Sequence, residues 1–165
     1  MLRTSILILT FSSLFCCTQN QALTTSDKER ILAELRPVVK NFTKACEQAD
    51  FNTAISVFED TKDFTAIVNG NAIPDFNSFK EEIRKQFDSL VSQQYTVASE
   101  KFDIISTTSA VYTMIGSDID QLKNGDRVLV NPLAVTFLLR RSNNEWKIFY
   151  MHESATIKID SSGVK

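Results

Sequence analysis

The chain has 165 residues, which fits one domain and leaves little room for two. Apolar residues make up 43% and charged residues 23%, enough for a core and ordinary for a globular protein. The formal net charge is −2 and no block of like charges occurs, which excludes the basic surface that nucleic acid or an anionic membrane would require. We therefore expect no nucleic-acid partner.

The N-terminus has the pattern of a secretory signal peptide. Arg3 precedes an apolar run over residues 6–15, and this run is shorter than the roughly 20 apolar residues that span a bilayer. The run ends at two cysteines, and polar residues follow. We expect export, removal of a signal peptide over residues 1–16, and a short tether over residues 17–25.

Leu14-Phe15-Cys16-Cys17 resembles a bacterial lipobox, in which a Leu lies three residues before a lipidated Cys. The resemblance implies that Cys17 is lipidated, that this lipid is the only membrane attachment, and that the protein belongs to the bacterial cell envelope. Phe15 and Cys16 depart from the usual small residues of the motif. Cleavage near Ala22 is the alternative, and it would give a soluble periplasmic or secreted protein.

Residues 26–90 have the apolar spacing of three helices. Steps of three and four over residues 31–49 predict a long first helix, in which Pro37 predicts a kink or a break. Asp50 can cap a short second helix, and residues 78–90 predict a third helix with one apolar face. A short strand is expected between the second and third helices, over residues 64–68.

The second half of the chain changes to a strand pattern. Four strands are predicted over residues 95–106, 110–119, 128–140 and 145–157, with Asn124-Gly125 as the turn of one hairpin. Helices followed by long strands predict an α+β domain over residues 26–157, with a tail over residues 158–165.

Few residues are suited to metal or disulfide chemistry. Beyond the leader Cys46 is the one other cysteine, so no disulfide framework is expected, and we interpret it as a small core residue. His152 is the single histidine. We therefore predict no metal site built from His and Cys and no cofactor.

The order of the elements resembles the nuclear transport factor 2-like superfamily, in its SnoaL-like and ketosteroid-isomerase-like branch. Residues 49–52 are similar to the family's helix-loop-helix start, residues 76–87 to its third helix, and residues 146–154, with Trp-x-Ile before His-x-Ser, to its closing strand. The resemblance implies a cone-shaped, cystatin-like fold in which a curved antiparallel sheet wraps around three N-terminal helices and leaves a pocket. Family members include isomerases, cyclases, dehydratases and non-catalytic domains, so the fold leaves the function open.

Side chains alternate between the two faces of a strand, and the resemblance places one face of the last strand in the pocket. That face is expected to hold Trp146, Ile148, Tyr150, His152 and Ser154, and Phe42 of the first helix is an interior position of the same pocket. His152 is the candidate general acid or base, with Tyr112 or Tyr150 as hydrogen-bond donor. A structural histidine and a core tyrosine are the alternatives.

The other face of the last strand is expected to hold Phe149 and Met151, with Leu138 of the preceding strand beside them. Because the helices can cover only one face of the sheet, these apolar side chains would lie on an uncovered convex face. Such a patch predicts a homodimer that packs sheet against sheet.

Two functions remain open. The first is a lipid-anchored, non-catalytic domain that binds a small, largely apolar molecule or an envelope protein, as the twelve phenylalanines and the absence of a carboxylate from residues 65–69 favour. The alternative is an isomerase, cyclase or dehydratase that uses His152 as general acid or base. The family's isomerase mechanism is not expected. Its carboxylate base lies on the first strand, and residues 65–69, which correspond to that strand here, contain no carboxylate.

Overall fold

The computed structural model describes residues 22–160, and the expected signal peptide with Cys17 lies outside them. Three helices come first: α1 (Thr25–Glu47), α2 (Phe51–Ser56) and α3 (Phe76–Ser89). Two short strands, β1 (Thr65–Val68) and β2 (Asn71–Ile73), lie between α2 and α3. Four long strands follow: β3 (Leu90–Ser106), β4 (Ser109–Leu122), β5 (Arg127–Ser142) and β6 (Glu145–Asp160).

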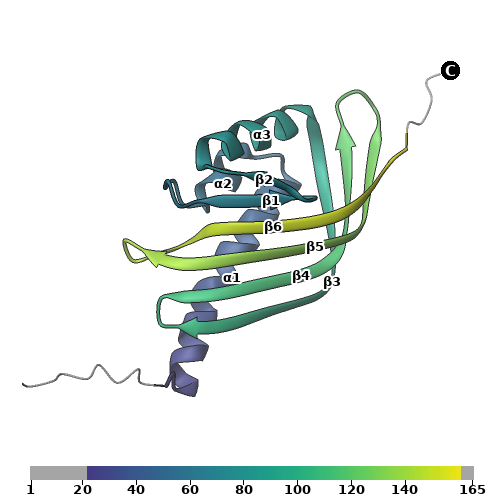
Figure 1. Cartoon of the computed structure of the whole chain (residues 1–165). Coiled ribbons are helices and arrows are strands. Elements are labelled where there is room, and N and C mark those ends of the chain that lie inside the picture. The colour runs from purple at the N-terminus through teal and green to yellow at the C-terminus, as the bar shows by residue number, and fades with distance from the viewer. Residues whose placement is uncertain (1–21, 161–165) are drawn as a thin grey trace, which may run out of the picture.

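All six strands form one sheet, in the order β2-β1-β6-β5-β4-β3. The long strands pair antiparallel through consecutive hairpins, and β1 joins the sheet parallel to β6. The long strands curve around the helices, and α1 crosses one face of the sheet (Figure 1). This is the predicted α+β cone, with β2 as an additional strand.

The helices begin where short polar side chains can cap them. Asp50 accepts a hydrogen bond from the backbone of Thr53 at the start of α2, and Asp75 does the same for Ser78 at the start of α3. The expected break at Pro37 does not occur, because α1 continues from Thr25 to Glu47. Among the described residues no helix is both long enough and apolar enough to cross a membrane.

Register shifts in the strand pairs mark where the sheet bends. On β6 Phe149 has no partner on β5, because Ile148 pairs with Leu139 and Tyr150 pairs with Leu138. An extra residue of this kind is a β-bulge, which kinks the strand and reverses which face the following side chains occupy. The bulge therefore decides which residues of β6 face the helices.

Aromatic side chains fill the core between α1, α2, α3 and the sheet. Phe58 is at its centre, with edge-on contacts to Phe42, Phe64, Phe79 and Phe137 at centroid distances of 4.8–6.3 Å. Such edge-to-face pairs add to the stabilisation that comes from burying the rings. Part of the heavy phenylalanine content is thus core packing.

Candidate functional site

A cavity of about 130 Å³ lies between the helices and the concave face of the sheet. Val39, Phe42, Thr43 and Cys46 reach it from one face of α1, at the spacing of successive helical turns. Further walls come from α3 and from all four long strands. Gln86 of α3 and Ile157 of β6 line the cavity and are also exposed, so they mark the side that reaches solvent.

Most of the cavity wall is apolar, and much of it is aromatic. The aromatic lining residues are Phe42, Phe58, Phe79, Phe87, Tyr95, Tyr112 and Phe137. An apolar cavity of about 150 Å³ in another protein holds a benzene molecule. The volume here therefore suits a single ring with a short substituent.

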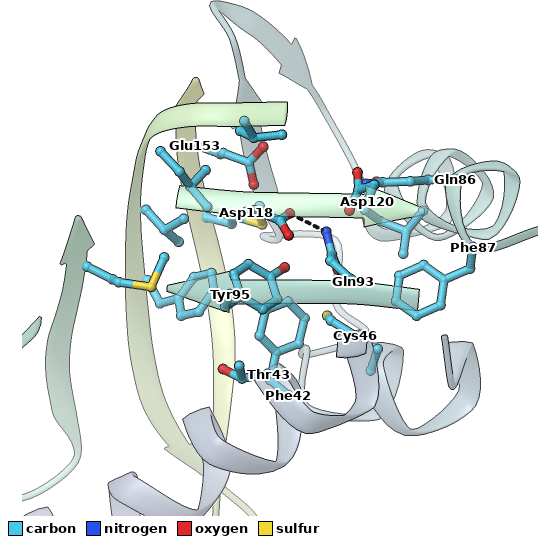
Figure 2. A pocket seen from close by; sticks show the side chains of 18 of the residues that line it. Phe42, Thr43, Cys46, Gln86, Phe87, Gln93, Tyr95, Asp118, Asp120 and Glu153 are labelled. Atoms are coloured by element: carbon cyan, nitrogen blue, oxygen red, sulfur yellow. Dashed lines mark hydrogen bonds between the residues drawn. The ribbon is translucent and has the colours of Figure 1, made fainter. Parts of the chain in front are cut away.

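Three carboxyl side chains interrupt this apolar wall (Figure 2). Asp118 and Asp120 come from alternate positions of β4, and Glu153 comes from β6. Asp118 is 4% exposed and Asp120 is 7% exposed. Gln93 of β3 donates a hydrogen bond from Nε2 to Oδ2 of Asp118 at 2.6 Å, whereas Oδ1 of Asp118 and Oδ1 of Asp120 are buried without a hydrogen-bond partner.

The position of the carboxyl groups changes their ionisation. Burial, and then the negative charge of Asp120, raise the pKa of Asp118 from 3.8 to about 7, against the hydrogen bond from Gln93. Burial also raises the pKa of Asp120. Burial and the charge of Asp120 raise the pKa of Glu153. The two aspartates titrate as a pair, which near neutral pH can hold one proton between them.

Two further groups in the cavity stay protonated. Burial raises the pKa of Cys46 to about 12, so its thiol is a poor nucleophile, in agreement with its interpretation as a core residue. Burial, and then the neighbouring Cys46, raise the pKa of Tyr95 well above its ordinary value. Tyr95 lies on the same side of the cavity as Asp118 and Gln93 (Figure 2), and its protonated hydroxyl can act as a hydrogen-bond donor there.

The structure brings two of the predicted site residues to the cavity. Phe42 and Tyr112 both line it. The hydroxyl of Tyr112 donates a hydrogen bond to Oε2 of Glu100 at 3.0 Å, and burial together with this bond raises the tyrosine pKa. Tyr112 is thus positioned as a wall of the cavity with its hydroxyl engaged by β3.

Two other predicted pocket residues are inside the cone but away from the cavity. Ile148 is fully buried in the core. Trp146 is buried at the start of β6, where Nε1 donates a hydrogen bond to Oε2 of Glu34 at 2.8 Å. Both side chains serve packing between β6 and the helices.

The expected face is wrong for Tyr150, His152 and Ser154, because the bulge at Phe149 reverses the alternation. His152 and Ser154 are exposed and Tyr150 is half-buried, and none of the three lines the cavity. The side chains that replace them inside are Met151 and Glu153. Because of this one unpaired residue, Glu153 lies in the cavity where the sequence predicted His152.

The same bulge changes which residues lie on the convex face of the sheet. Met151 is 5% exposed and lines the cavity, so it is not part of an outer apolar patch. Phe149 is half-buried on the outside, with the guanidinium of Arg140 4.8 Å from its ring centroid, and Leu138 is half-buried too. The homodimer remains a prediction.

Reasoning from the sequence missed the carboxyl pair. Tyr112, Met114, Gly116, Asp118 and Asp120 are at alternate positions of one strand, so the predicted strand at 110–119 already placed Asp118 on the face of Tyr112. Because the strand was predicted to end at residue 119, Asp120 was not assigned to it. Within residues 22–160 no group of three His, Cys, Asp or Glu side chains is arranged to hold a metal ion.

The comparisons with known proteins agree with the fold. The family model of the SnoaL-like domain matches residues 35–158. The chain belongs to the SnoaL-like family. No curated protein matches the sequence.

Several solved structures are similar to this SnoaL-like chain. A protein assigned as a scytalone dehydratase from Novosphingobium aromaticivorans has a TM-score of 0.71 at 10% identity, covering 86% of this chain and 94% of its own. A protein assigned as a dehydratase of the NTF2-like family from Streptomyces avermitilis has a TM-score of 0.69 at 15% identity, covering 79% and 99%. A hexachlorocyclohexane dehydrochlorinase from Novosphingobium barchaimii has a TM-score of 0.67 at 10% identity, covering 85% and 97%. At these identities the similarity establishes the fold.

Proposed function

We propose that this SnoaL-like domain is an acid–base enzyme that binds a small, largely apolar molecule in the cone cavity. The observation that carries the proposal is the pair of buried carboxyl groups, Asp118 and Asp120, each with an oxygen that has no partner, in an aromatic cavity. Titratable groups with shifted pKa values in an apolar pocket are typical of catalytic sites.

The pair supplies both halves of a proton transfer. Near neutral pH Asp118 can hold the shared proton as general acid while Asp120 is ionised as general base, because burial and the charge of Asp120 raise the pKa of Asp118 to about 7. In an elimination the base removes a proton from carbon, and the electron pair of that bond forms the new double bond. The leaving group departs with its bonding electrons and takes the proton of the acid. In an isomerisation the proton is returned to another carbon.

The similar structures favour elimination over other acid–base reactions. Two of the proteins described above are assigned as dehydratases and one is a dehydrochlorinase, and each of these names denotes loss of a small molecule from a substrate. This support is by analogy of fold, so the residues of the cavity remain the main argument.

Binding without catalysis is the second candidate, favoured by the seven aromatic side chains of the wall. The two candidates differ in what the carboxyl groups do. An assay with a panel of single-ring β-hydroxy ketones distinguishes catalysis from binding alone. Loss of water from these compounds gives a conjugated product, whose formation is followed by ultraviolet absorbance. We expect turnover that falls about 100-fold or more in Asp118→Asn and Asp120→Asn, with His152→Gln as the matched control at an exposed position.

Failure of the wild-type protein to dehydrate any member of the panel, while binding them, would favour the non-catalytic candidate. Full activity in both aspartate variants would contradict the proposed acid and base. Isosteric substitution keeps the volume of each side chain, so a thermal melt shows whether a loss of turnover reflects a loss of folding.

The same proposal places the domain in the cell envelope. The apolar run over residues 6–15 supports export, and Cys17 supports a lipid anchor that would attach the domain to the membrane. Metabolic labelling with a radioactive fatty acid should mark the wild-type chain and leave Cys17→Ser unlabelled. Labelling of both chains, or of neither, would contradict the lipid anchor at Cys17.

A further inference from the structure

The distribution of charge in the cavity identifies the kind of molecule it accepts. Three carboxyl side chains, Asp118, Asp120 and Glu153, share the wall formed by β4, β5 and β6. Among the lining residues in the described part of the chain none is Lys, Arg or His. The cavity therefore contains acidic groups with no basic side chain in its wall to balance them.

Several acidic side chains elsewhere in the domain form salt bridges. Glu59 pairs with Arg140, Glu34 pairs with Arg141, and Asp103 pairs with Lys101. The cavity aspartates differ, because Asp118 receives one hydrogen bond from Gln93 and each aspartate keeps a buried oxygen without a donor. A buried polar atom without a partner destabilises a protein by about 1–3 kcal/mol. Such atoms mark a place where a ligand can supply the missing donors.

The two buried oxygens without partners require a ligand that offers at least two hydrogen-bond donors. A hydroxyl group donates one hydrogen bond, and a carbonyl group donates none. A primary ammonium donates three, and it also opposes the charge of the carboxylates, which makes each hydrogen bond stronger. The two partnerless oxygens and the third carboxyl group of the same wall can accept hydrogen bonds from such a cation.

The aromatic part of the wall fits the same cation. Rings of Phe42, Phe87 and Tyr95 surround the cavity on the side of α1 and β3 (Figure 2). The face of an aromatic ring attracts a cation, and the attraction grows when water is excluded. The rings also accept the apolar body of a ligand that a cavity of about 130 Å³ can hold.

We propose that the cavity binds a small aromatic or alicyclic amine in its protonated form, with the ammonium group on the carboxyl pair of Asp118 and Asp120, Glu153 on the same wall, and the ring among the phenylalanines. This inference rests on the proposed function, because it takes the cavity as the ligand site and names the class of the ligand. The carboxyl groups then have two roles, recognition of the cation and transfer of a proton.

Matched probes test the inference. Isothermal titration of the full-length protein at pH 8 compares 2-phenylethylamine, which is a cation, with 2-phenylethanol, which has the same ring and chain but no charge. We expect the amine to bind about tenfold tighter or more. In Glu153→Gln and Asp120→Asn this preference should shrink toward equal affinity, while the affinity for the alcohol changes little.

Chemical-shift changes should locate the amine in the cavity, with Met151 as reporter and the exposed His152 as control. Equal affinity of the two probes, or no saturable binding of the amine, would overturn the inference. So would an amine preference that survives in both carboxyl variants. Tight binding of the alcohol with no preference for the amine would reject the ligand class and still support the cavity as the ligand site, so the failure of this inference is distinct from that of the proposed function.

Discussion

Replacing Asp118 by Asn should make the domain more stable at alkaline pH, although it removes the proposed acid. The pKa of Asp118 is 3.8 in an unfolded chain and about 7 in the folded domain. Between these two values the folded state holds a proton that the unfolded state has lost, so the stability of the wild-type domain falls as the pH rises. Asn cannot ionise and does not contribute this loss.

The magnitude follows from the difference between the two pKa values. Each pH unit corresponds to 1.36 kcal/mol, and the interval from 3.8 to about 7 is about three units. Ionised Asp118 therefore costs the fold about 4 kcal/mol at pH 8 and close to nothing at pH 4. Asn can still accept the hydrogen bond from Gln93, so the comparison changes the charge and little else.

Urea denaturation at pH 4 and at pH 8 measures the effect, with Trp146, the single tryptophan, as the fluorescent reporter. We expect the free energy of unfolding of Asp118→Asn to exceed that of the wild type by a few kcal/mol at pH 8, with a much smaller difference at pH 4. Asp88→Asn, at an exposed position of α3, is the control for the same change of side chain outside the cavity. A difference between Asp118→Asn and wild type that does not change with pH would refute the reasoning.

Three other substitutions or treatments test the fold and the cavity. Phe58→Ala should lower the free energy of unfolding by about 3–5 kcal/mol, because Phe58 is the centre of the aromatic core, and the same urea titration measures this loss. Gly116→Ala should give little folded protein, since a Cβ there would overlap the carbonyl oxygen of Thr96, and circular dichroism of the soluble fraction would show this; a normal spectrum would contradict the close approach. Cys46 should resist iodoacetamide at pH 8 in the folded domain and react in urea, because burial raises its pKa to about 12; peptide mapping that finds rapid modification of the folded protein would show an accessible thiol.

The fold could be predicted because its signals are local and repeated. The apolar stripe of α1, the cap at Asp50 and the turn at Asn124-Gly125 each indicate one element, and together with the closing strand they indicate the cone. Strand β2, with three residues and no apolar pattern, offered no such signal. A single sequence specifies long elements better than short ones, because a long pattern averages over more residues.

The site was harder to predict, because it depends on a single backbone irregularity. Up to Ile148 the alternation predicted for β6 holds, and both Trp146 and Ile148 are buried. Beyond Phe149 every assignment is reversed, which is the consequence of shifting a strand by one residue. No residue at the bulge is a glycine or a proline, so the sequence contains no residue that would indicate an irregularity there.

The stability cost of Asp118 is itself an argument for a functional cavity. Domains are stable by about 5–15 kcal/mol, so a loss of about 4 kcal/mol at pH 8 is a large fraction of the total. An apolar side chain at position 118 would continue the wall that Met114 and Val130 begin, with no such loss. Ligand binding can return part of the cost, since an ammonium group that stabilises the ionised carboxylates lowers their pKa values. The wild-type melting temperature at pH 8 should therefore rise with the concentration of 2-phenylethylamine, and Asp118→Asn, already relieved of the charge, should gain less.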